Sequence, residues 1–352
     1  MGALMSSLIL EVPQSSSETV LVTGVCGFIA SHLAHALLRS GVRVIGVDQR
    51  PPGSNVRRLQ DQARFELVVA QLQDGDLAGY LRGVTKVFHL AAATNVQDSW
   101  GAGFSDHAIS TVLGTQRLLS ACRQAGVPRV MVASSSHVYG MTAELAREDA
   151  PLNPMSPYGV AKLAAERLAV AYAHRSGAPM SVVALRHFTA YGPHCPDAMV
   201  VMRLFRAALT GRPMPLYGDG TQLHSWTHVD DIVAATLLAG HLSMDAGDAE
   251  VVNVAGPDHA SLTQVVDLVA QITGRRVPLT RSGARAGDAA STCADLTRAR
   301  QVLGFVPQVG VEDGLTRQWR WLNRELSEGQ QVAPAVGLVS PPPFRHRGGV
   351  QI

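Results

Sequence analysis

The 352-residue chain contains few lysines, cysteines and charged residues. Charged residues make up 16% of the sequence, the formal net charge is +2 and no long basic run occurs, so no nucleic-acid partner is expected. No apolar stretch approaches the roughly 20 residues that a membrane-spanning helix needs, which argues against a membrane partner. The cysteines Cys26, Cys122, Cys195 and Cys293 are far apart and form no CxxC pair. This spacing argues against a disulfide framework and against a metal site.

The two ends of the chain lack the pattern of a folded domain. Residues 1–17 are serine-rich and are expected to form a loose leader. The first basic residue is Arg39, so the basic start of a secretory signal peptide is missing, and residues 2–6 match the short N-myristoylation pattern, which often occurs by chance. Residues 329–352 contain no acidic residue and are expected to be a disordered tail. These features predict a cytoplasmic protein.

The middle of the chain alternates between short β-branched runs and longer helical stretches. Strands are expected at residues 19–23, 42–47, 65–69, 87–90, 130–134 and 181–185. Helices are expected at residues 28–39, 115–125 and 157–174, with a turn at residues 51–55. This alternation predicts an α/β fold of the Rossmann type, in which a doubly wound parallel sheet has helices on both faces.

After Tyr191 the sequence changes to segments punctuated by proline and glycine, with helices expected near residues 199–209 and 262–273. We therefore expect a first domain over residues 18–190 and a smaller C-terminal domain over residues 191–328. The chain is expected to cross back to the first domain around residues 224–256.

A glycine-rich turn, TGVCGFIA, joins the first expected strand to the first expected helix. Gly24 permits the tight bend, Gly27 lets a pyrophosphate approach the backbone, and Ala30 lets helix and strand pack closely. Asp48 follows the second strand, where a carboxylate can bind an adenosine ribose and would repel a 2′-phosphate. The pattern favours NAD over NADP, although Arg50 lies nearby. The alternative is a glycine turn followed by a surface aspartate.

Tyr158 and Lys162 lie four residues apart in an expected helix, so both side chains project from one face. Of the 30 basic residues only Lys86 and Lys162 are lysines, which indicates that a lysine is needed at particular positions. A tyrosine that acts as a base near neutral pH needs its pKa lowered by about 3 units, and an ammonium ~4 Å away supplies roughly that free energy. The spacing predicts an acid–base pair. The alternative is a solvent-facing Tyr/Lys pair.

The chain resembles the extended short-chain dehydrogenase/reductase family in seven segments, found in the family's order: TGVCGFIASHL, FHLAAATNV, SSSHVYG, SPYGVAK, LRHFTAYGP, YGDGTQLHSWTHVDDIV and GDAASTCADLTRARQVLGF. Within that family it is most similar to the NAD-dependent nucleotide-sugar epimerases and dehydratases, over about Val20 to Trp321. The resemblance implies a NAD-binding Rossmann domain, a smaller C-terminal substrate domain for the nucleotide sugar, and tightly held NAD. It also implies a homodimer built from two helices of each subunit.

The resemblance assigns roles to residues by motif. Tyr158 would be the catalytic base, Lys162 its partner and Ser135 the hydroxyl beside the sugar oxygen, with His137 as a further catalytic candidate. The implied NAD-binding residues are Gly24, Cys26, Gly27, Phe28, Ile29, Asp48, Gln71, Leu72, Ala91, Ala92, Ser134, Tyr158, Lys162 and His187. The implied substrate-binding residues are Ser136, Thr189, Met199, Tyr217, His224 and Arg285.

The two residues after Ser135 distinguish reactions within this family. The 4,6-dehydratases carry Asp-Glu there and the uronate decarboxylases carry Glu directly before VYG, whereas this chain has Ser136 and His137. Without those carboxylates we predict a 4-epimerase, which oxidises a sugar at C4 to a bound 4-keto sugar and returns the hydride to the other face. Two alternatives stay open: a nucleotide-sugar dehydratase or oxidoreductase that uses His137 in an unusual role, and a NAD-binding regulatory protein without turnover. His137 itself is either an acid–base group or a structural histidine.

The segment FTAYGP, followed by Pro196-Asp197, is most similar to the UDP-glucuronate 4-epimerases. A UDP-hexose or a UDP-uronate is therefore the expected partner. His194, Cys195 and His224 stand where arginines are expected. Because arginine binds carboxylates and phosphates through two hydrogen bonds, these differences leave the sugar and the nucleotide open.

Overall fold

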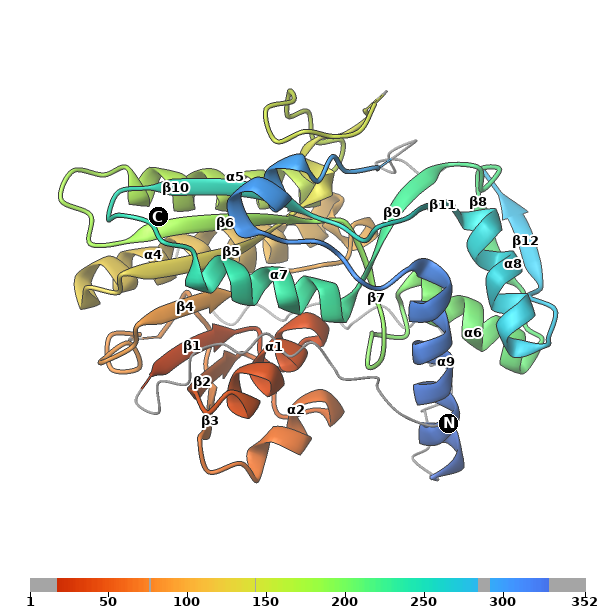
Figure 1. The fold of residues 1–352 in the computed structure, drawn as a ribbon, viewed down its shortest axis with the longest axis horizontal. Coiled ribbons are helices and arrows are strands. Elements are labelled where there is room, and N and C mark those ends of the chain that lie inside the picture. The colour runs from red at the N-terminus through yellow and green to blue at the C-terminus, as the bar shows by residue number, and fades with distance from the viewer. Residues whose placement is uncertain (1–17, 76, 143, 284–291, 329–352) are drawn as a thin grey trace, which may run out of the picture.

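The computed structural model describes residues 18–75, 77–142, 144–283 and 292–328, so the predicted leader and tail lie outside the described residues. The main feature is a parallel sheet whose strands follow the order β10-β6-β5-β4-β1-β2-β3 (Figure 1). Its strands are β1 (Thr19–Thr23), β2 (Arg43–Asp48), β3 (Phe65–Val69), β4 (Lys86–His89), β5 (Arg129–Ser135), β6 (Ser181–His187) and β10 (Ala249–Val254).

Helices cover both faces of this sheet. The residues of β1 alternate between the two faces: Val20 and Val22 belong to one buried apolar cluster and Leu21 to the other. Helices α1 (Phe28–Arg39) and α7 (Val229–His241) contribute to the first cluster, and α4 (Gly114–Ala125) and α5 (Pro157–Ala173) contribute to the second. Two short helices, α2 (Ser54–Gln60) and α3 (Phe104–Asp106), lie in the connections. The predicted doubly wound α/β fold is confirmed.

A smaller unit follows β6 and lies to the right of the large sheet in Figure 1. Its strands are β7 (Thr189–Tyr191), β9 (Leu223–His228) and β11 (His259–Ser261) in one sheet, and β8 (Met214–Tyr217) and β12 (Leu279–Ser282) in another. Its helices are α6 (Val200–Thr210), α8 (Leu262–Thr273) and α9 (Val311–Ser327). Between β9 and β11 the chain returns to the large sheet, where α7 covers one face and β10 pairs with β6.

Several elements differ from the sequence-based expectation. The turn expected at residues 51–55 runs into α2, and a π-helix, η3 (His107–Leu113), precedes α4. Strand β6 extends two residues past the expected end because Arg186 and His187 continue the pairing with β5. The charge of Arg186 suggests the end of a buried strand, but in the structure Arg186 stays buried because it pairs with the buried carboxylate of Glu166.

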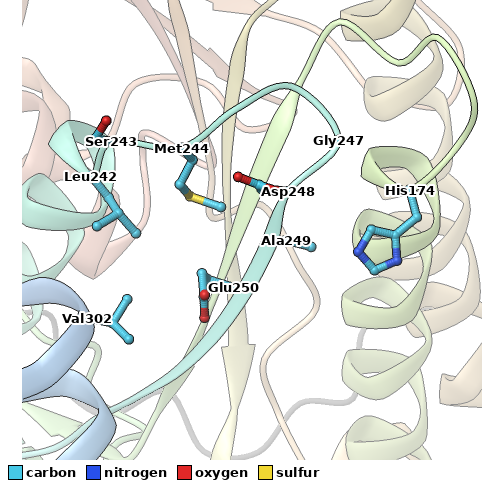
Figure 2. Close-up of a pocket in the computed structure, with 9 residues that line it drawn as sticks. All are labelled: His174, Leu242, Ser243, Met244, Gly247, Asp248, Ala249, Glu250 and Val302. Atoms are coloured by element: carbon cyan, nitrogen blue, oxygen red, sulfur yellow. The ribbon is translucent and has the colours of Figure 1, made fainter.

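No helix in the described ranges is long and apolar enough to span a membrane. A hollow of about 480 Å³ opens where His174, after the end of α5, faces the turn between α7 and β10 (Figure 2). The acidic groups of its lining already have partners, because Asp248 accepts a hydrogen bond from the Asp245 N–H and Glu250 pairs with Arg298. The hollow lies where β10 begins, whereas ligands of doubly wound sheets bind where strands end. The carboxyl ends of the strands, on the opposite side of the sheet, are therefore the candidate site.

Candidate active site

The turn between β1 and α1 is shaped to hold a phosphate group. Gly24 has a φ of +71°, and a Cβ atom there would lie 2.8 Å from the backbone nitrogen of Ala91, so a glycine is required. Gly27 donates its N–H to the Gly24 carbonyl at 2.8 Å and precedes the first residues of α1, Phe28 and Ile29. Gly27 is the N-cap residue of α1 and has no side chain that could bond to the first N–H groups of the helix. The first backbone N–H groups of α1 are therefore available to an anion.

Asp48 ends β2 beside this turn and is 5% exposed. Its Oδ2 accepts a hydrogen bond from the Cys26 N–H and its Oδ1 accepts one from the Arg50 N–H, both at 2.9 Å. The Arg50 guanidinium also donates to the carboxylate, with the Nε–Oδ1 distance at 3.2 Å. The glycine turn thus fixes the orientation of the Asp48 carboxylate. A ribose hydroxyl bound there would replace the Arg50 guanidinium as a hydrogen-bond donor to that carboxylate.

A hollow of about 370 Å³ lies next to Asp48, at the ends of β2 and β3. It is lined by Gln49, Val69, Ala70, Gln71, Asp74 and Gly75. Gln71, a predicted cofactor residue, therefore faces this hollow, whereas Leu72 belongs to the buried core. The hollow, the carboxylate of Asp48 and the phosphate-binding turn follow one another along the edge of the sheet, as the parts of a dinucleotide would.

The segment after β4, which contains Ala91 and Ala92, is held by a buried chain of hydrogen bonds. The Ala91 N–H donates to Thr23 Oγ1 at 3.1 Å, and Thr23 Oγ1 lies 2.7 Å from His89 Nδ1. His89 Nε2 lies 2.8 Å from Thr115 Oγ1. Burial lowers the pKa of His89 to about 3, so the imidazole is neutral. This chain fixes the segment against the glycine turn, although the sequence did not single out His89 or Thr115.

Helix α5 begins at Pro157, directly after Ser156, whose Oγ accepts a hydrogen bond from the Gly159 N–H at 3.1 Å. This cap fixes the first turn, which carries Tyr158. Lys162 follows one turn later and donates from Nζ to the Ala133 carbonyl of β5 at 2.5 Å. The structure therefore brings the predicted Tyr/Lys pair to the carboxyl end of β5.

Ser135 ends β5 and lies within hydrogen-bonding reach of the Tyr158 side chain. Burial raises the pKa of the Tyr158 phenol, and the hydrogen bond with Ser135 acts in the opposite direction. Burial lowers the pKa of Lys162 to about 8, and the charge of Glu166 opposes this shift. The phenol is therefore protonated at neutral pH until more positive charge arrives, while Lys162 carries its charge below about pH 8.

Two histidines lie against the ring of Tyr158. The ring of His137 meets it edge-on with centroids 5.3 Å apart, and the ring of His107 does so at 5.9 Å. Burial lowers the pKa of His137 to about 4 and also lowers that of His107, so both rings are neutral near pH 7. His107 is 2% exposed and was missed from the sequence, because it lies in the unexpected π-helix η3.

Two further predicted cofactor residues, Ser134 and His187, lie next to Ser135 at the ends of β5 and β6. Ser134 Oγ donates to Glu166 at 2.6 Å, so this predicted cofactor residue faces the core. His187 pairs in register with Ser135 across β5 and β6, and burial lowers its pKa to about 3. Its Nε2 is buried and has no hydrogen-bond partner among the described residues, which leaves one polar atom for a bound molecule.

The predicted substrate residues come from the end of β5 and from several elements of the smaller unit. Ser136 is buried in the short turn η4 (Ser136–Val138), while Thr189 begins β7 and Met199 precedes α6. His224 in β9 pairs through Nδ1 with Thr292 Oγ1 at 2.7 Å and lies near enough to His137 to affect its pKa. Tyr217 ends β8, in the separate two-stranded sheet. Arg285 lies outside the described residues.

The loop after β7 turns His194 and Cys195 toward other helices. His194 has a φ of +63°, and its Nε2 lies 3.0 Å from an Arg58 guanidinium nitrogen. Its ring lies 4.7 Å from that of Trp321, and burial lowers its pKa to about 3. The Gln318 amide donates to Cys195 Sγ at 3.0 Å, and burial raises the pKa of this thiol to about 12. Neither side chain supplies a positive charge.

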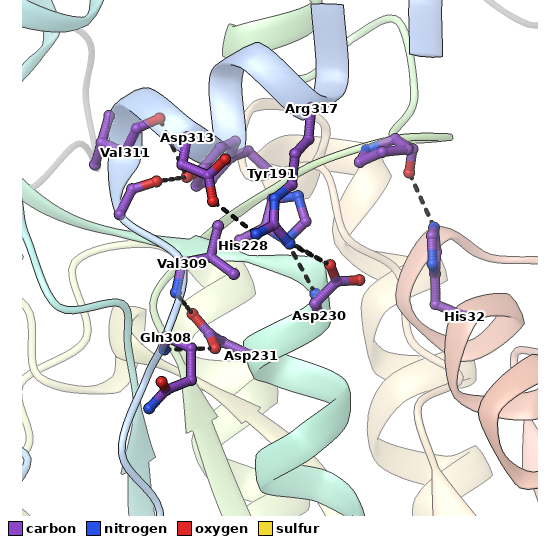
Figure 3. Close-up of polar contacts among 12 residues, drawn as sticks. His32, Tyr191, His228, Asp230, Asp231, Gln308, Val309, Val311, Asp313 and Arg317 are labelled. Atoms are coloured by element: carbon purple, nitrogen blue, oxygen red, sulfur yellow. Dashed lines mark hydrogen bonds and ion pairs between the residues drawn. The ribbon is translucent and has the colours of Figure 1, made fainter. Parts of the chain in front are cut away.

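Polar contacts between α7 and the α9 region fasten the two parts of the molecule together (Figure 3). Asp231 accepts hydrogen bonds from the backbone N–H groups of Gln308 and Val309 at 2.9 and 3.0 Å. Arg317 of α9 donates to Asp230 at 3.3 Å. We call these five residues the α9 clasp. Because α7 packs on the large sheet, the clasp joins the smaller unit to that sheet.

Comparison with known proteins agrees with this geometry. The profile of the NAD dependent epimerase/dehydratase family matches residues 20–255. The chain belongs to this family. It is 38% identical over 322 residues to an uncharacterised UDP-glucose epimerase of Bacillus subtilis (strain 168), covering 88% of this chain and 99% of that one. The family prediction is confirmed.

Two solved members of the family have similar folds. MoeE5 in complex with UDP-glucuronic acid and NAD is 44% identical, with a TM-score of 0.82, and the match covers 87% of this chain and 99% of that chain. The UDP-glucuronic acid 4-epimerase of Bacillus cereus, in complex with UDP-glucuronic acid and NAD, is 32% identical with a TM-score of 0.83 and the same coverage.

The sequence does not reveal two buried residues behind the end of β5, Glu166 and Arg186. Glu166 and Arg186 form an ion pair at 2.7 Å whose side chains are 0% and 2% exposed. Glu166 stands one turn after Lys162, a spacing that the sequence shows, but its partner comes from β6. A buried charge twenty positions from its partner has no local pattern that reveals it.

Proposed function

We propose that this protein is a NAD-dependent nucleotide-sugar 4-epimerase that acts on a UDP-hexose or a UDP-hexuronate. The observation that carries the proposal is the meeting of Ser135, Tyr158 and Lys162 at the end of β5, with Ser136 and His137 in place of a carboxylate pair. The names of the relatives, a UDP-glucose epimerase and a UDP-glucuronic acid 4-epimerase, support the same reaction.

The residues at the sheet edge fit NAD. A cradle that a Cβ atom on Gly24 would fill, the carboxylate of Asp48 and the hollow beside Gln71 match a pyrophosphate, a ribose and an adenine in that order. Ala91, Ala92 and His187 border the same edge, where β4 and β6 end. Bound NAD would supply the acceptor and donor of a hydride and, in its oxidised form, a positive charge.

The residues of this chain perform the proton transfer. Tyr158 takes the proton of the sugar C4 hydroxyl through its phenolic oxygen, as the carbon gives up its hydride and becomes a carbonyl carbon. Lys162 stabilises the phenolate by its charge, and the Ser135 hydroxyl holds the C4 oxygen. After the 4-keto sugar presents its other face, Tyr158 returns the proton to the C4 oxygen. No net oxidation results.

The residues around Tyr158 favour epimerisation over loss of water. Elimination needs a second acid–base pair, and the positions after Ser135 hold Ser136 and a neutral His137. With a pKa of about 4, His137 is a weak candidate for proton transfer at pH 7, and its edge-on contact suits it to hold the Tyr158 ring. His137 thus belongs to the site as a neighbour of the base.

The sugar is either a hexose or a hexuronate. MoeE5 has been solved with UDP-glucuronic acid and with UDP-glucose. In this chain Ser136, directly after β5, and Thr189, at the start of β7, carry hydroxyl groups that suit either a carboxylate or a hydroxymethyl group. His194 and Cys195 face α2 and α9 and leave the sugar few charged contacts.

The functional unit is a homodimer that works in the cytoplasm. Three apolar side chains on packed helices are exposed, Ile109 and Leu113 on η3 by 44% and 40% and Val160 on α5 by 48%. Burial of such a face between two copies would remove this apolar surface from water. Light scattering is expected to give twice the chain mass for the wild type and the chain mass for Ile109→Asp/Val160→Asp. A monomeric wild type would contradict the proposal. The cytoplasmic location stays a prediction of the sequence.

The decisive test is an isotope experiment. UDP-glucose and UDP-glucuronic acid deuterated at C4 are incubated with the protein in ordinary water, and the products are analysed by NMR. Retention of deuterium at C4 of an inverted sugar supports epimerisation by hydride return. Migration of the label to C6, or its loss to solvent, would instead favour the dehydratase alternative, and NAD binding without any conversion would favour a regulatory protein.

A further inference from the structure

The last three residues of β5 each contact one residue on a single face of α5. The Ala133 carbonyl accepts a hydrogen bond from Lys162, the Ser134 hydroxyl donates to Glu166, and Ser135 lies within hydrogen-bonding reach of Tyr158. The α5 residues are spaced by four, which places them above one another along the helix. The reaction uses two of these three contacts. The third, through Glu166, has no role in the proposed chemistry.

Glu166 is fully buried, and its carboxylate is bound on both oxygens. Oε2 accepts from Ser134 Oγ at 2.6 Å and from Arg186 Nε at 3.0 Å, while Oε1 accepts from Arg186 Nη2 at 2.7 Å. Arg186 is held in turn by the Tyr139 hydroxyl at 2.8 Å and the Glu148 carbonyl at 3.1 Å. A buried ion pair is often no more stabilising than apolar residues of the same volume, so its position next to Lys162 needs another explanation.

The other titratable groups around Lys162 are neutral. His89 of β4, His107 of η3 and His187 of β6 all interact with its charge. Burial lowers the pKa of each, which favours the neutral imidazole. In the part of the chain that the structure describes, Glu166 is the acidic group that acts on Lys162. Burial alone would favour the uncharged amine.

We propose that Glu166 is a positioning residue of the site: its anchored carboxylate seats Lys162 against β5 and keeps the ammonium charged beside Tyr158. Arg186 and Ser134 hold the carboxylate in place, and Lys162 transmits its effect to the base. The relevance to turnover rests on the proposed function, whereas the effect on Lys162 itself does not.

The rarity of lysine in this chain gives a direct readout. Lys86 and Lys162 are its two lysines, and Lys86 forms an ion pair with Glu18 at 2.7 Å, which an arginine can also form. In a Lys86→Arg background, protein labelled with ¹³C at lysine Cε therefore gives one lysine signal, that of Lys162. Its chemical shift is followed by NMR from pH 6 to pH 11. We expect a titration near pH 8 in this background, and in Glu166→Gln a pKa lower by about one unit or more, a tenfold change in the protonation equilibrium.

Two further variants separate charge from folding. Glu166→Gln leaves Arg186 buried without its partner, so Glu166→Gln/Arg186→Met, which removes both charges, is measured in parallel. The Lys162 pKa is expected to fall in this variant as well. Glu148→Gln is the matched control: its carboxylate accepts from the Asn253 N–H at 2.8 Å and feels the charge of Arg186, but it does not act on Lys162. The Lys162 titration is expected to be unchanged in this control.

The pH profile of kcat gives the second readout. Activity falls as Lys162 loses its proton, so the alkaline limb is expected to move to lower pH in the Glu166 variants while KM changes little. An unchanged Lys162 pKa in both Glu166 variants would overturn the inference, as would an equal shift in Glu148→Gln. A shifted Lys162 pKa in a protein that converts no UDP-sugar supports the role of Glu166 and refutes the proposed function.

Discussion

The contact between β5 and α5 and the α9 clasp each contain a buried carboxylate, but the two carboxylates have different partners. Glu166 pairs with the Arg186 guanidinium at 2.7 Å, one helical turn from Lys162. Asp231 is 3% exposed and accepts hydrogen bonds from the backbone N–H groups of Gln308 and Val309. Backbone N–H groups that bind Asp231 fix the path of the chain at residues 308–309. The charge of Glu166 acts in addition on a neighbouring titratable group, Lys162. Substitutions at the first contact should therefore change the chemistry, and those in the clasp should change stability.

The largest effect is expected for Tyr158→Phe, which removes the phenolic oxygen and leaves the ring between His107 and His137. Because a general base contributes about 10²- to 10⁴-fold, kcat should fall by that amount while the melting temperature stays near that of the wild type. The measurement is the rate of UDP-sugar conversion, with bound NAD followed by mass spectrometry.

The matched control for this variant is Tyr172→Phe, on the same helix. Its hydroxyl accepts a hydrogen bond from the Gln116 amide at 2.9 Å, away from the end of β5. Activity should be retained in this control. Loss of NAD from Tyr158→Phe, or equal loss of activity in both variants, would contradict the assignment of Tyr158 as the base.

The next largest effect is expected for Lys162→Arg, which keeps the positive charge. Lys162 is 6% exposed and donates a 2.5 Å hydrogen bond to the Ala133 carbonyl, a position with room for a compact ammonium. The longer, planar guanidinium cannot occupy it without displacing β5 from α5. We expect kcat to fall by about 10²-fold in steady-state assays. Turnover near that of the wild type would show that charge alone is sufficient.

The sequence predicted those parts of the fold and site that have a local pattern. Alternating strands and helices predicted the sheet, and Tyr158 and Lys162 could be placed on one helix face by their spacing alone. The pairing of Glu166 with Arg186 joins α5 to β6, so no spacing reveals it. The orientation of His194 was equally hidden, because its partner Arg58 lies 136 positions away.

In the clasp, Asp231→Asn tests stability without chemistry. An asparagine side chain has one oxygen, so it can accept from one of the two N–H groups but directs its own N–H₂ at the other. The free energy of unfolding should fall by about 2 kcal/mol, while kcat of the folded protein stays within about twofold. Denaturant titration measures the first quantity. Asp230→Asn is the control, because its side chain is 56% exposed and an asparagine can keep its contacts with exposed Arg317 and with His228 Nδ1, which lies 3.3 Å away. The exposed pair with Arg317 contributes about 0.5 kcal/mol or less.

The smallest effect is expected for His137→Gln. This variant distinguishes an acid–base role of the histidine from a structural role beside Tyr158. The imidazole is neutral near pH 7, because burial lowers its pKa to about 4, and it meets Tyr158 edge-on at 5.3 Å. A group that is already deprotonated cannot define a limb of the activity profile between pH 6 and pH 9. A neutral amide can occupy much of the same space, and the Ser135 hydroxyl still accepts from the backbone N–H of residue 137. We therefore expect kcat to fall less than about tenfold, with the pH profile unmoved. A loss of 10²-fold or more, together with the disappearance of one limb, would make His137 an acid–base group and would favour a dehydratase, since elimination needs that second group.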